Sequence, residues 1–543
     1  MTILTIDKKQ FEKKVGKMDK EMDNTITMMG TPVESVSDNE ISIEVFPNRP
    51  DLLSYQGFCR SLLQYLGKKK FAEYNVNKPL KDYVVKIEKP VKSVRPYTAC
   101  AIVKGLKLDN EKIKEIIDIQ EKLHLTLGRK RKKLAIGIYP LEKIKLPIRY
   151  TAKKPDEIKF IPLEFDKELT GAQILRQHPT GRDYAFLLEG YDLYPVFIDA
   201  NNKVLSMPPI INSRETGKID ENTKEVFIEC SGSNLVYLKK TINIIASTLA
   251  DMGGQIYAME IQDSENFISP DLKPEKIKVN LSDINKTLGL NLNEKDFIKY
   301  LQKMGLEYEK GEVLIPAYRA DILHWVDIAE EVAIGYGYEN FNAELPKIST
   351  VGEEDKREVL KNIIREILVG LNLLEVSSFH LAIKDDIKKM NYDFKDFIEI
   401  ENSKTEYNVL RMDLASNLLK ILSENSDSAY PQKMFEIGKV FSLDKSNSNG
   451  VEEKERLCVA LSHDSVNFTE LKSVLDYLFK MLDKSYRLEQ FDNFNFIPGR
   501  SAKIFVDNFE IGIIGEVAPR VLSNWKLKMP VSAFELNIGF LSL

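Results

Sequence analysis

Four carboxylates stand within eleven residues of one another in the segment PAYRADILHWVDIAEEVAIGYGY, residues 316–338. They are Asp321, Asp327, Glu330 and Glu331. If the segment is helical, Asp327 lies three and four positions before the two glutamates, so their side chains share one flank of a helix. Hard cations prefer carboxylate and water oxygens, and no basic side chain lies among the four, which indicates a Mg²⁺ site. The alternative is a solvated acidic face with Asp321 as the helix N-cap.

An earlier segment repeats this pattern without the extra acids. Residues 48–67, NRPDLLSYQGFCRSLLQYLG, and residues 318–337 both run Arg-x-Asp-(Leu/Ile)-Leu-x-aromatic into a predicted helix. Aligning the two pairs Asp51 with Asp321, and an Asp at this place is expected to cap the helix. Where the second copy has Asp327, Glu330 and Glu331, the first has Gly57, Arg60 and Ser61. The fold of the repeat therefore does not require the extra carboxylates.

The composition is that of an ordinary globular protein in several domains. A chain of 543 residues predicts three or four domains, and a composition of 43% hydrophobic and 29% charged residues indicates neither a disordered nor a membrane protein. The start, MTILTIDKKQ, lacks the apolar run of a signal peptide, and the four scattered cysteines are typical of a reducing compartment, so we expect a cytoplasmic protein. A net charge of -5 means that nucleic acid would have to bind a local basic patch. The densest is GRKRKK, residues 128–133, which is either a solvated loop or a contact for tRNA phosphates.

Alternating strand-like and helix-like periods predict a multidomain α+β protein. We expect an N-terminal domain at 1–85, a mixed α+β domain at 86–268, a small unit at 271–345 and a last domain at 350–543. The segment SENFISPDLKPEKIKVN, residues 264–280, carries two prolines and is predicted to be a linker.

The run from Ile315 to Tyr338 resembles a segment of the β subunit of phenylalanyl-tRNA synthetase. Further runs resemble the same family and keep its order: FPNRPDLLSYQG, HPTGRDYAFLL, VLSMPPIINSRETGKI, FEIGKVF and PGRSAKIFVDNFEIGIIGEVAPRVL. The length and the PPIINS run are similar to the archaeal and eukaryotic form. The bacterial form carries an additional tRNA-binding barrel and a further C-terminal domain, for which this chain has no room.

The resemblance implies an α2β2 heterotetramer that joins phenylalanine to tRNA(Phe) with ATP, the active site being in the α subunit. It implies small N-terminal and B5-like repeat units, a mixed α+β editing domain and a degenerate class II synthetase domain with an antiparallel sheet. A working class II site needs arginines beside ATP, whereas the strand FEIGKVF has none, and only Gly499 precedes Arg500 in IPGRSAKIF. We therefore expect residues 350–543 to serve assembly. The resemblance also implies that the four carboxylates hold Mg²⁺ at the junction with the α subunit.

In this family the middle domain hydrolyses tyrosine mischarged onto tRNA(Phe), because a hydrophobic pocket rejects an added hydroxyl only weakly. Onto the matching strands we place Ser206, Asn212 and Glu229 as the residues that recognise the phenolic hydroxyl. The alternative is that Ser206 and Asn212 only satisfy turn backbone around two prolines. His178 either orients the substrate or is a loop residue before Pro179.

Two other functions remain open at this stage. One is a free-standing tRNA-editing or tRNA-binding protein without a synthetase partner. The other is a magnesium-dependent hydrolase centred on residues 321–331, which would need an open pocket and a polarising group that the aromatic and aliphatic neighbours do not supply.

Overall fold

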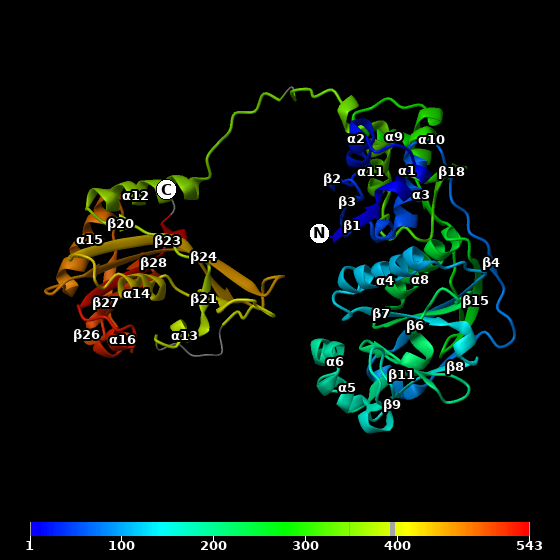
Figure 1. Ribbon diagram of the computed structural model, residues 1–543. Helices are drawn as coiled ribbons and strands as arrows, with labels where there is room; N and C mark the ends of the chain where they lie inside the picture. Colours follow the sequence, from blue (N-terminus) through cyan, green and yellow to red (C-terminus); the bar gives the residue numbers. More distant parts are fainter. Residues whose placement is uncertain (1, 347, 391–396, 542–543) are drawn as a thin grey trace. The chain divides into compact units, whose positions relative to one another are not determined.

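The computed structural model describes residues 2–346, 348–390 and 397–541, and the chain divides into two compact units, 1–345 and 346–543 (Figure 1). Both units contain helices and sheets, which confirms the multidomain α+β prediction. The finer division into four domains remains a prediction. None of the described helices is long and apolar enough to cross a membrane.

The chain begins with a small three-stranded antiparallel sheet in the order β1-β3-β2, flanked by helices. Its elements are β1 (Thr2–Asp7), α1 (Lys8–Lys14), α2 (Lys20–Met28), β2 (Val33–Val36), β3 (Glu40–Val45) and α3 (Tyr55–Tyr65). Helix α3 holds the first copy of the repeat. Its N-cap is Ser54, whose Oγ accepts a hydrogen bond from the Gly57 amide at 3.0 Å.

The middle of the first unit is built on an eleven-stranded sheet with the strand order β13-β12-β11-β8-β5-β15-β6-β14-β7, to which β16 and β4 add at β15. Its strands are β4 (Val76–Asn77), β5 (Val84–Ile87), β6 (Tyr97–Lys104), β7 (Leu134–Pro140), β8 (Ile148–Lys153), β11 (Tyr194–Ile198), β12 (Val204–Met207), β13 (Ile211–Asn212), β14 (Val226–Gly232), β15 (Gln255–Gln262) and β16 (Phe267–Ser269). The connections carry a short pair, β9 (Lys159–Phe160) and β10 (Leu169–Thr170), and the helices α4 (Asn110–Leu125), α5 (Gly171–Gln177), α6 (Pro179–Tyr184), α7 (Arg214–Gly217) and α8 (Leu235–Asp251).

Strand alternation sorts the side chains of β14 onto two faces. Ile228 and Cys230 point into the core beneath α4 and α8, whereas Phe227 belongs to the core on the opposite face, with residues of β8, β11 and β12. Glu229 shares the face of Phe227. The acid is therefore directed toward the space between the two ends of the sheet, where it is 2% exposed.

A third sheet, in the order β17-β19-β18, carries the second copy of the repeat. Its elements are β17 (Glu275–Lys278), α9 (Leu281–Leu288), α10 (Glu294–Lys303), β18 (Glu307–Glu309), β19 (Glu312–Ile315) and α11 (Trp325–Tyr336). The linker prediction for residues 264–280 is wrong, because this stretch supplies β16 and β17. The prediction that Asp51 and Asp321 cap their helices is also wrong: His324 is the N-cap of α11, and each Asp instead binds the arginine two residues before it.

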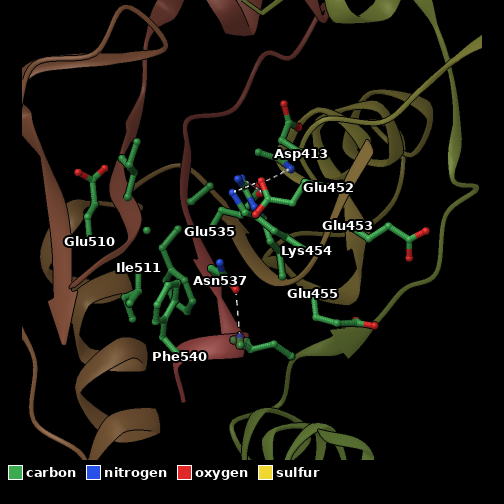
Figure 2. A pocket seen from close by; sticks show the side chains of 18 of the residues that line it. Asp413, Glu452, Glu453, Lys454, Glu455, Glu510, Ile511, Glu535, Asn537 and Phe540 are labelled. Atoms are coloured by element: carbon green, nitrogen blue, oxygen red, sulfur yellow. Dashed lines mark hydrogen bonds and ion pairs between the residues drawn. The ribbon is translucent and has the colours of Figure 1, made fainter. Parts of the chain in front are cut away.

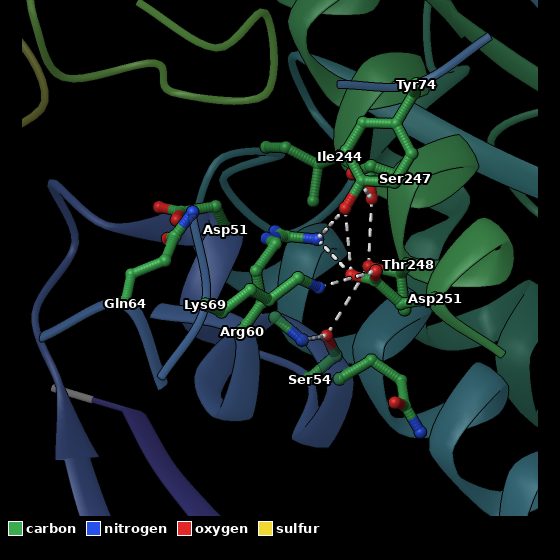
Figure 3. Close-up of polar contacts among 12 residues, drawn as sticks. Asp51, Ser54, Arg60, Gln64, Lys69, Tyr74, Ile244, Ser247, Thr248 and Asp251 are labelled. Atoms are coloured by element: carbon green, nitrogen blue, oxygen red, sulfur yellow. Dashed lines mark hydrogen bonds and ion pairs between the residues drawn. The ribbon is translucent and has the colours of Figure 1, made fainter. Parts of the chain in front are cut away.

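A buried ion pair fastens α3 to the end of α8, as Figure 3 shows. Arg60 Nη1 donates to Asp251 Oδ2 at 2.5 Å and to the Tyr74 hydroxyl at 2.9 Å, and the Arg60 guanidinium lies 4.0 Å from the ring centre of Tyr318. Lys69 approaches the other carboxylate oxygen at 3.4 Å but is 38% exposed, against 1% for Arg60. The repeat position that is Glu330 in the second copy thus serves packing in the first.

The second unit is built on a seven-stranded sheet in the order β20-β23-β24-β28-β27-β26-β25. The pairing of β20 with β23 is parallel, and those from β23 to β25 are antiparallel. Its elements are α12 (Lys356–Gly370), β20 (Leu374–Glu375), β21 (Leu381–Ile383), α13 (Lys384–Ile387), β22 (Tyr407–Leu410), α14 (Ala415–Glu424), β23 (Gln432–Leu443), β24 (Val451–Ser462), α15 (Phe468–Met481), β25 (Arg487–Gln490), β26 (Phe496–Val506), β27 (Phe509–Val517), α16 (Pro519–Asn524) and β28 (Val531–Asn537). Helices α12 and α15 pack on one face and α14 and α16 on the other.

The two cations that contact Asp251 are expected to contribute very differently to the free energy of unfolding, because Arg60 is buried and Lys69 is exposed. Asp251→Asn leaves the Arg60 charge buried without its counter-ion, so we expect the free energy of unfolding to fall by about 3–5 kcal/mol. Lys69→Gln, the matched control, removes only the exposed partner and should cost less than about 1 kcal/mol. Urea unfolding of the full chain in a Trp525→Phe background, followed by Trp325 fluorescence, measures the unit that contains the pair. Equal losses in the two variants would contradict this role of Arg60.

Candidate functional site

The two edge strands of the large sheet in the first unit, β7 and β13, lie close enough for one side chain to join them, and a cavity of about 380 Å³ lies beside this contact. Tyr139 of β7 bridges two of the polar residues at this cavity. Its hydroxyl lies 3.3 Å from Asn212 Oδ1 on β13 and 3.2 Å from Glu229 Oε1 on β14. Ser206, on β12, is the Cα partner of Asn212. The three residues predicted from the sequence, Ser206, Asn212 and Glu229, therefore line one cavity.

Gly137 makes room for this bridge. It is the cross-strand partner of Glu229, and a Cβ on it would come within 2.1 Å of the Tyr139 hydroxyl and 2.6 Å of Glu229 Oε1. Neither Gly137 nor Tyr139 was singled out from the sequence. A glycine inside the strand KLAIGIYP was the available signal, since such glycines mark a close approach of other groups.

Two buried oxygens at this cavity have no hydrogen-bond partner among the residues that the structure describes. They are Ser206 Oγ and Glu229 Oε2, and both residues are 2% exposed. Buried polar atoms are nearly always paired, so two orphans on one cavity mark a place where a polar group of a ligand can bind. Asn212 Oδ1 accepts a hydrogen bond from the Tyr139 hydroxyl, and Ser206 Oγ binds no backbone group among the described residues. Neither side chain therefore stabilises the turn around the two prolines through these atoms.

Glu229 is held in its neutral form near physiological pH. Burial raises the pKa of Glu229 to about 8, although the Tyr139 hydroxyl, the Arg95 charge and the Ser231 hydroxyl act in the opposite direction. A neutral carboxyl can accept a hydrogen bond at one oxygen and donate one from the other. Since Oε1 faces Tyr139, Oε2 can carry the proton toward the cavity.

His178 lies apart from these residues. It ends α5 and precedes α6, its Nε2 lies 3.0 Å from the carbonyl oxygen of Leu163, and its ring packs on Phe165. The residue is buried at a helix junction and does not line the cavity of Glu229.

The four carboxylates of the second repeat copy are divided among different partners. Arg319, 1% exposed, donates from Nη2 to Asp321 Oδ2 at 2.6 Å and forms an ion pair with Glu331 Oε1 at 2.8 Å. Asp327 Oδ2 accepts the Leu323 and His324 amides at 2.7 Å each. Glu330 is exposed.

The charges of this cluster confirm that Arg319 acts as its cation. Burial by itself would raise the pKa of Asp321, but the adjacent Arg319 guanidinium lowers it to about 2. The first copy has the same geometry: Arg49 donates to Asp51 at 2.9 Å and to Ser61 Oγ at 3.3 Å, and Ser61 occupies the position of Glu331. Within the described residues, no group of three or more His, Cys, Asp or Glu side chains is arranged to hold a metal ion. A basic side chain does lie among the four acids, contrary to the expectation from their spacing, because Arg319 folds back onto Asp321 and Glu331.

In the second unit an arginine from outside the strand FEIGKVF reaches that strand. Arg411 Nη1 donates to Glu436 Oε1 at 2.6 Å, both side chains being 2% exposed, and Arg411 Nε donates to the Lys439 carbonyl at 2.7 Å. A Cβ on Gly438 would come within 2.3 Å of the guanidinium, so the glycine allows this approach. Because its charge is already paired, Arg411 is not available to neutralise a triphosphate.

A cavity of about 740 Å³ lies in the same unit, and its charged lining is mostly acidic (Figure 2). Six carboxylates line it, Asp413, Glu452, Glu453, Glu455, Glu510 and Glu535, against three cations, Arg357, Lys454 and Arg456. Glu535 is fully engaged: Oε2 accepts the Leu414 and Ala415 amides at 3.0 Å each, and Oε1 accepts Arg456 Nη1 at 2.8 Å. An anionic nucleotide would meet repulsion here.

Comparison with protein-family models gives three matches along the chain. Residues 82–247 match the B3/4 domain, residues 277–338 the tRNA synthetase B5 domain, and residues 342–538 the phenylalanyl tRNA synthetase beta chain CLM domain. The cavity of Glu229 is formed within the first match, and the Arg319 cluster within the second.

Curated relatives match nearly the whole chain. The phenylalanine–tRNA ligase beta subunit of Thermococcus sibiricus is 39% identical over 498 residues, 90% of this chain and 88% of the relative. That of Archaeoglobus fulgidus is 36% identical over 552 residues, 99% of this chain and 98% of the relative. An N-terminal fragment of the phenylalanyl-tRNA synthetase beta subunit from Pyrococcus horikoshii, solved by crystallography, is 36% identical with a TM-score of 0.59 and covers 62% of this chain and 99% of the fragment. These matches confirm the resemblance found in the sequence: the chain belongs to the phenylalanine–tRNA ligase beta subunit family and is part of that ligase.

Proposed function

We propose that this chain assembles with a phenylalanyl-tRNA synthetase α subunit into an α2β2 enzyme of the cytoplasm, and that ATP, phenylalanine and the 3′ end of tRNA(Phe) react in the α subunit. The paired Arg411 and the acidic cavity of the second unit support this division, because neither suits a triphosphate. Leu323, Val326 and Tyr338 are 80%, 44% and 54% exposed around α11, which is favourable for contact with a partner. The second unit is then a degenerate class II domain that serves assembly.

Phenylalanine-dependent ATP–pyrophosphate exchange tests this assignment. We expect exchange when this chain is mixed with the α subunit and none from either subunit alone, because in the described part of the second unit Arg411 is already paired and the charged lining of the cavity is mostly acidic. Exchange by this chain alone would show that its synthetase-like domain is active. If the mixture is also inactive with an α subunit known to be competent, the free-standing editor becomes the better interpretation.

We further propose that the cavity of Glu229 hydrolyses tyrosine esterified to tRNA(Phe). The observation that carries this proposal is the pair of orphan oxygens, Ser206 Oγ and Glu229 Oε2, on a cavity large enough for an aromatic side chain. A phenolic hydroxyl needs a donor and an acceptor, and neutral Glu229 with Ser206 and Asn212 can provide both. Phenylalanine would leave these groups unsatisfied, so the site discriminates in favour of tyrosine.

Substitutions of Glu229 test whether its neutral or its ionised form recognises tyrosine. Gln reproduces a carboxyl that accepts at one end and donates at the other, so below pH 8 we expect Glu229→Gln to keep the kcat/KM ratio for Tyr-tRNA(Phe) over Phe-tRNA(Phe) within about threefold. Glu229→Ala should lower that ratio roughly 10- to 100-fold, since the hydrogen bonds are lost. Above pH 8 the unsubstituted carboxyl ionises and loses its donor, so its ratio should fall while that of the Gln variant stays flat.

Deacylation of both substrates by the α2β2 enzyme between pH 6.5 and 9 measures these ratios. A Gln variant as impaired as the Ala variant at pH 7 would contradict the neutral form, and unchanged ratios in both variants would contradict the site.

The Mg²⁺ site of four carboxylates stays a prediction, and the residues as arranged do not fit it. Asp321 and Glu331 already neutralise Arg319, and Asp327 accepts two backbone amides. A cation binding all four acids would have to displace a buried guanidinium that has no other counter-ion within this cluster. We therefore assign no step of the reaction to a metal in this subunit.

Removal of Arg319 tests which cation holds the cluster. In the Trp525→Phe background, Arg319→Met should lower the free energy of unfolding by about 3–5 kcal/mol, because two buried carboxylates lose their partner. Millimolar Mg²⁺ should restore part of this loss and leave the unsubstituted chain unchanged. The control, Arg176→Met, removes an exposed arginine of the same unit and should change little. Stabilisation of the unsubstituted chain by Mg²⁺ would instead favour the metal site.

A further inference from the structure

The basic loop at residues 128–133, GRKRKK, has a rare backbone conformation. Arg129, Lys130 and Arg131 follow one another in the left-handed region, with φ of 47°, 53° and 63°. This conformation is unfavourable for every residue other than glycine, because Cβ approaches the following carbonyl oxygen. Backbone hydrogen bonds hold the turn, from the Arg131 amide to the His124 carbonyl at 3.1 Å and from the Lys133 amide to the Gly128 carbonyl at 2.9 Å. Strain of this kind persists where the surrounding structure imposes it, often at functional sites.

One side chain of the loop is fastened to the cavity of Glu229. Arg131 Nη1 donates to the Ile210 carbonyl at 2.8 Å, Nη2 donates to Glu121 Oε1 at 2.8 Å, and the guanidinium lies 4.4 Å from the ring centre of Tyr184. Arg131, Glu121, Tyr184 and Ile210 all line that cavity. The loop is therefore tied to the cavity wall on one side by α4 and on the other by the turn before Asn212.

Three other cations of the loop are open to solvent. Arg129, Lys130 and Lys132 are exposed, and no ion pair of theirs occurs in the part of the chain that the structure describes. Three unneutralised positive charges thus stand next to a residue of the cavity in a chain whose net charge is -5. Such a cluster repels itself, and the strained turn keeps it together, so it suits a ligand that carries several negative charges.

We propose that Arg129, Lys130 and Lys132 bind backbone phosphates at the acceptor end of the tRNA whose aminoacyl ester enters the cavity of Glu229. This inference rests on the proposed editing function. The aminoacyl group is attached to the terminal ribose, and the last phosphates follow directly along the strand. Cations that hold them must therefore lie close to the cavity, and these three are the sequence neighbours of Arg131, which lines it. The contacts are to phosphate and carry no base specificity.

The test compares two tyrosine esters in the α2β2 enzyme. One is mischarged Tyr-tRNA(Phe), and the other is 3′-O-tyrosyl-adenosine, which has the ester and the terminal nucleoside but no phosphate. The variant is Arg129→Gln, Lys130→Gln, Lys132→Gln. The matched control, Lys286→Gln, Lys295→Gln, Lys299→Gln, removes the same charge from exposed positions on α9 and α10 of the same unit.

We expect the loop variant to lose Tyr-tRNA(Phe) hydrolysis mainly through a higher KM. Each lost phosphate contact reduces the slope of log affinity against log salt by about 0.7–0.9, so the kcat/KM of the parent enzyme should fall roughly 15- to 40-fold more steeply than that of the variant between 50 and 200 mM salt. Hydrolysis of tyrosyl-adenosine should stay within about twofold, and the control variant should match the parent on both substrates.

Three outcomes would overturn the proposal. An equal loss on both esters would mean that the loop only supports the cavity wall. An unchanged KM and salt slope on Tyr-tRNA(Phe) would mean that the cations bind no phosphate. If the parent enzyme hydrolyses neither ester, the editing function itself fails, and this inference fails with it.

Discussion

A buried guanidinium cannot lose its proton, and this constraint organises both units of the chain. Arg49, Arg60, Arg319 and Arg411 are each at most 8% exposed, and each brings a carboxylate out of water with it. Such pairs contribute less to stability than their attraction suggests, because desolvation offsets it, but breaking one is costly. They therefore act mainly on the specificity of the fold. Arg60 keeps its counter-ion only when α3 packs at one place on α8, and Arg411 keeps its counter-ion only when it reaches Glu436 of β23.

The same constraint explains why an acidic sequence pattern is a weak indicator of a metal. Carboxylates gathered by a guanidinium and carboxylates gathered by Mg²⁺ have the same residue types and the same helical spacing. What separates them is whether a cation is already present, and Arg319 approaches its acids only through the turn that precedes α11. The first repeat copy makes the point independently, since Arg49 binds Asp51 in the same way while Ser61 takes the place of Glu331.

Local pattern was enough to predict the repeat, and the family resemblance directed attention to the strands that line the cavity, but neither predicted the contacts that complete them. Ser206, Asn212 and Glu229 could be chosen from two strands, whereas Tyr139, which connects the last two, lies far from both in sequence. It reaches Asn212 because the fold brings β7 and β13, which stand at opposite ends of the strand order, within reach of one side chain. Long-range closure of this kind leaves no periodicity in the sequence, so Gly137 was the only local trace of it. The helix-cap predictions were wrong for a different, local reason. Asp51 and Asp321 each bind the arginine two residues before them and not the backbone amides of the helix.

The buried acids of the two units show how the surroundings of a carboxyl separate structure from function. Glu436 and Glu535 use both oxygens, the first on Arg411 and Ser378 and the second on Arg456 and two amides, so each completes a packed arrangement. Glu229 is as deeply buried, yet one of its oxygens faces a cavity without a partner. A protein gains no stability from leaving that atom unsatisfied. A ligand of the kind we propose would satisfy it, and the strained basic loop on the same cavity wall would supply the charge to bring a polyanionic carrier of that ligand into place.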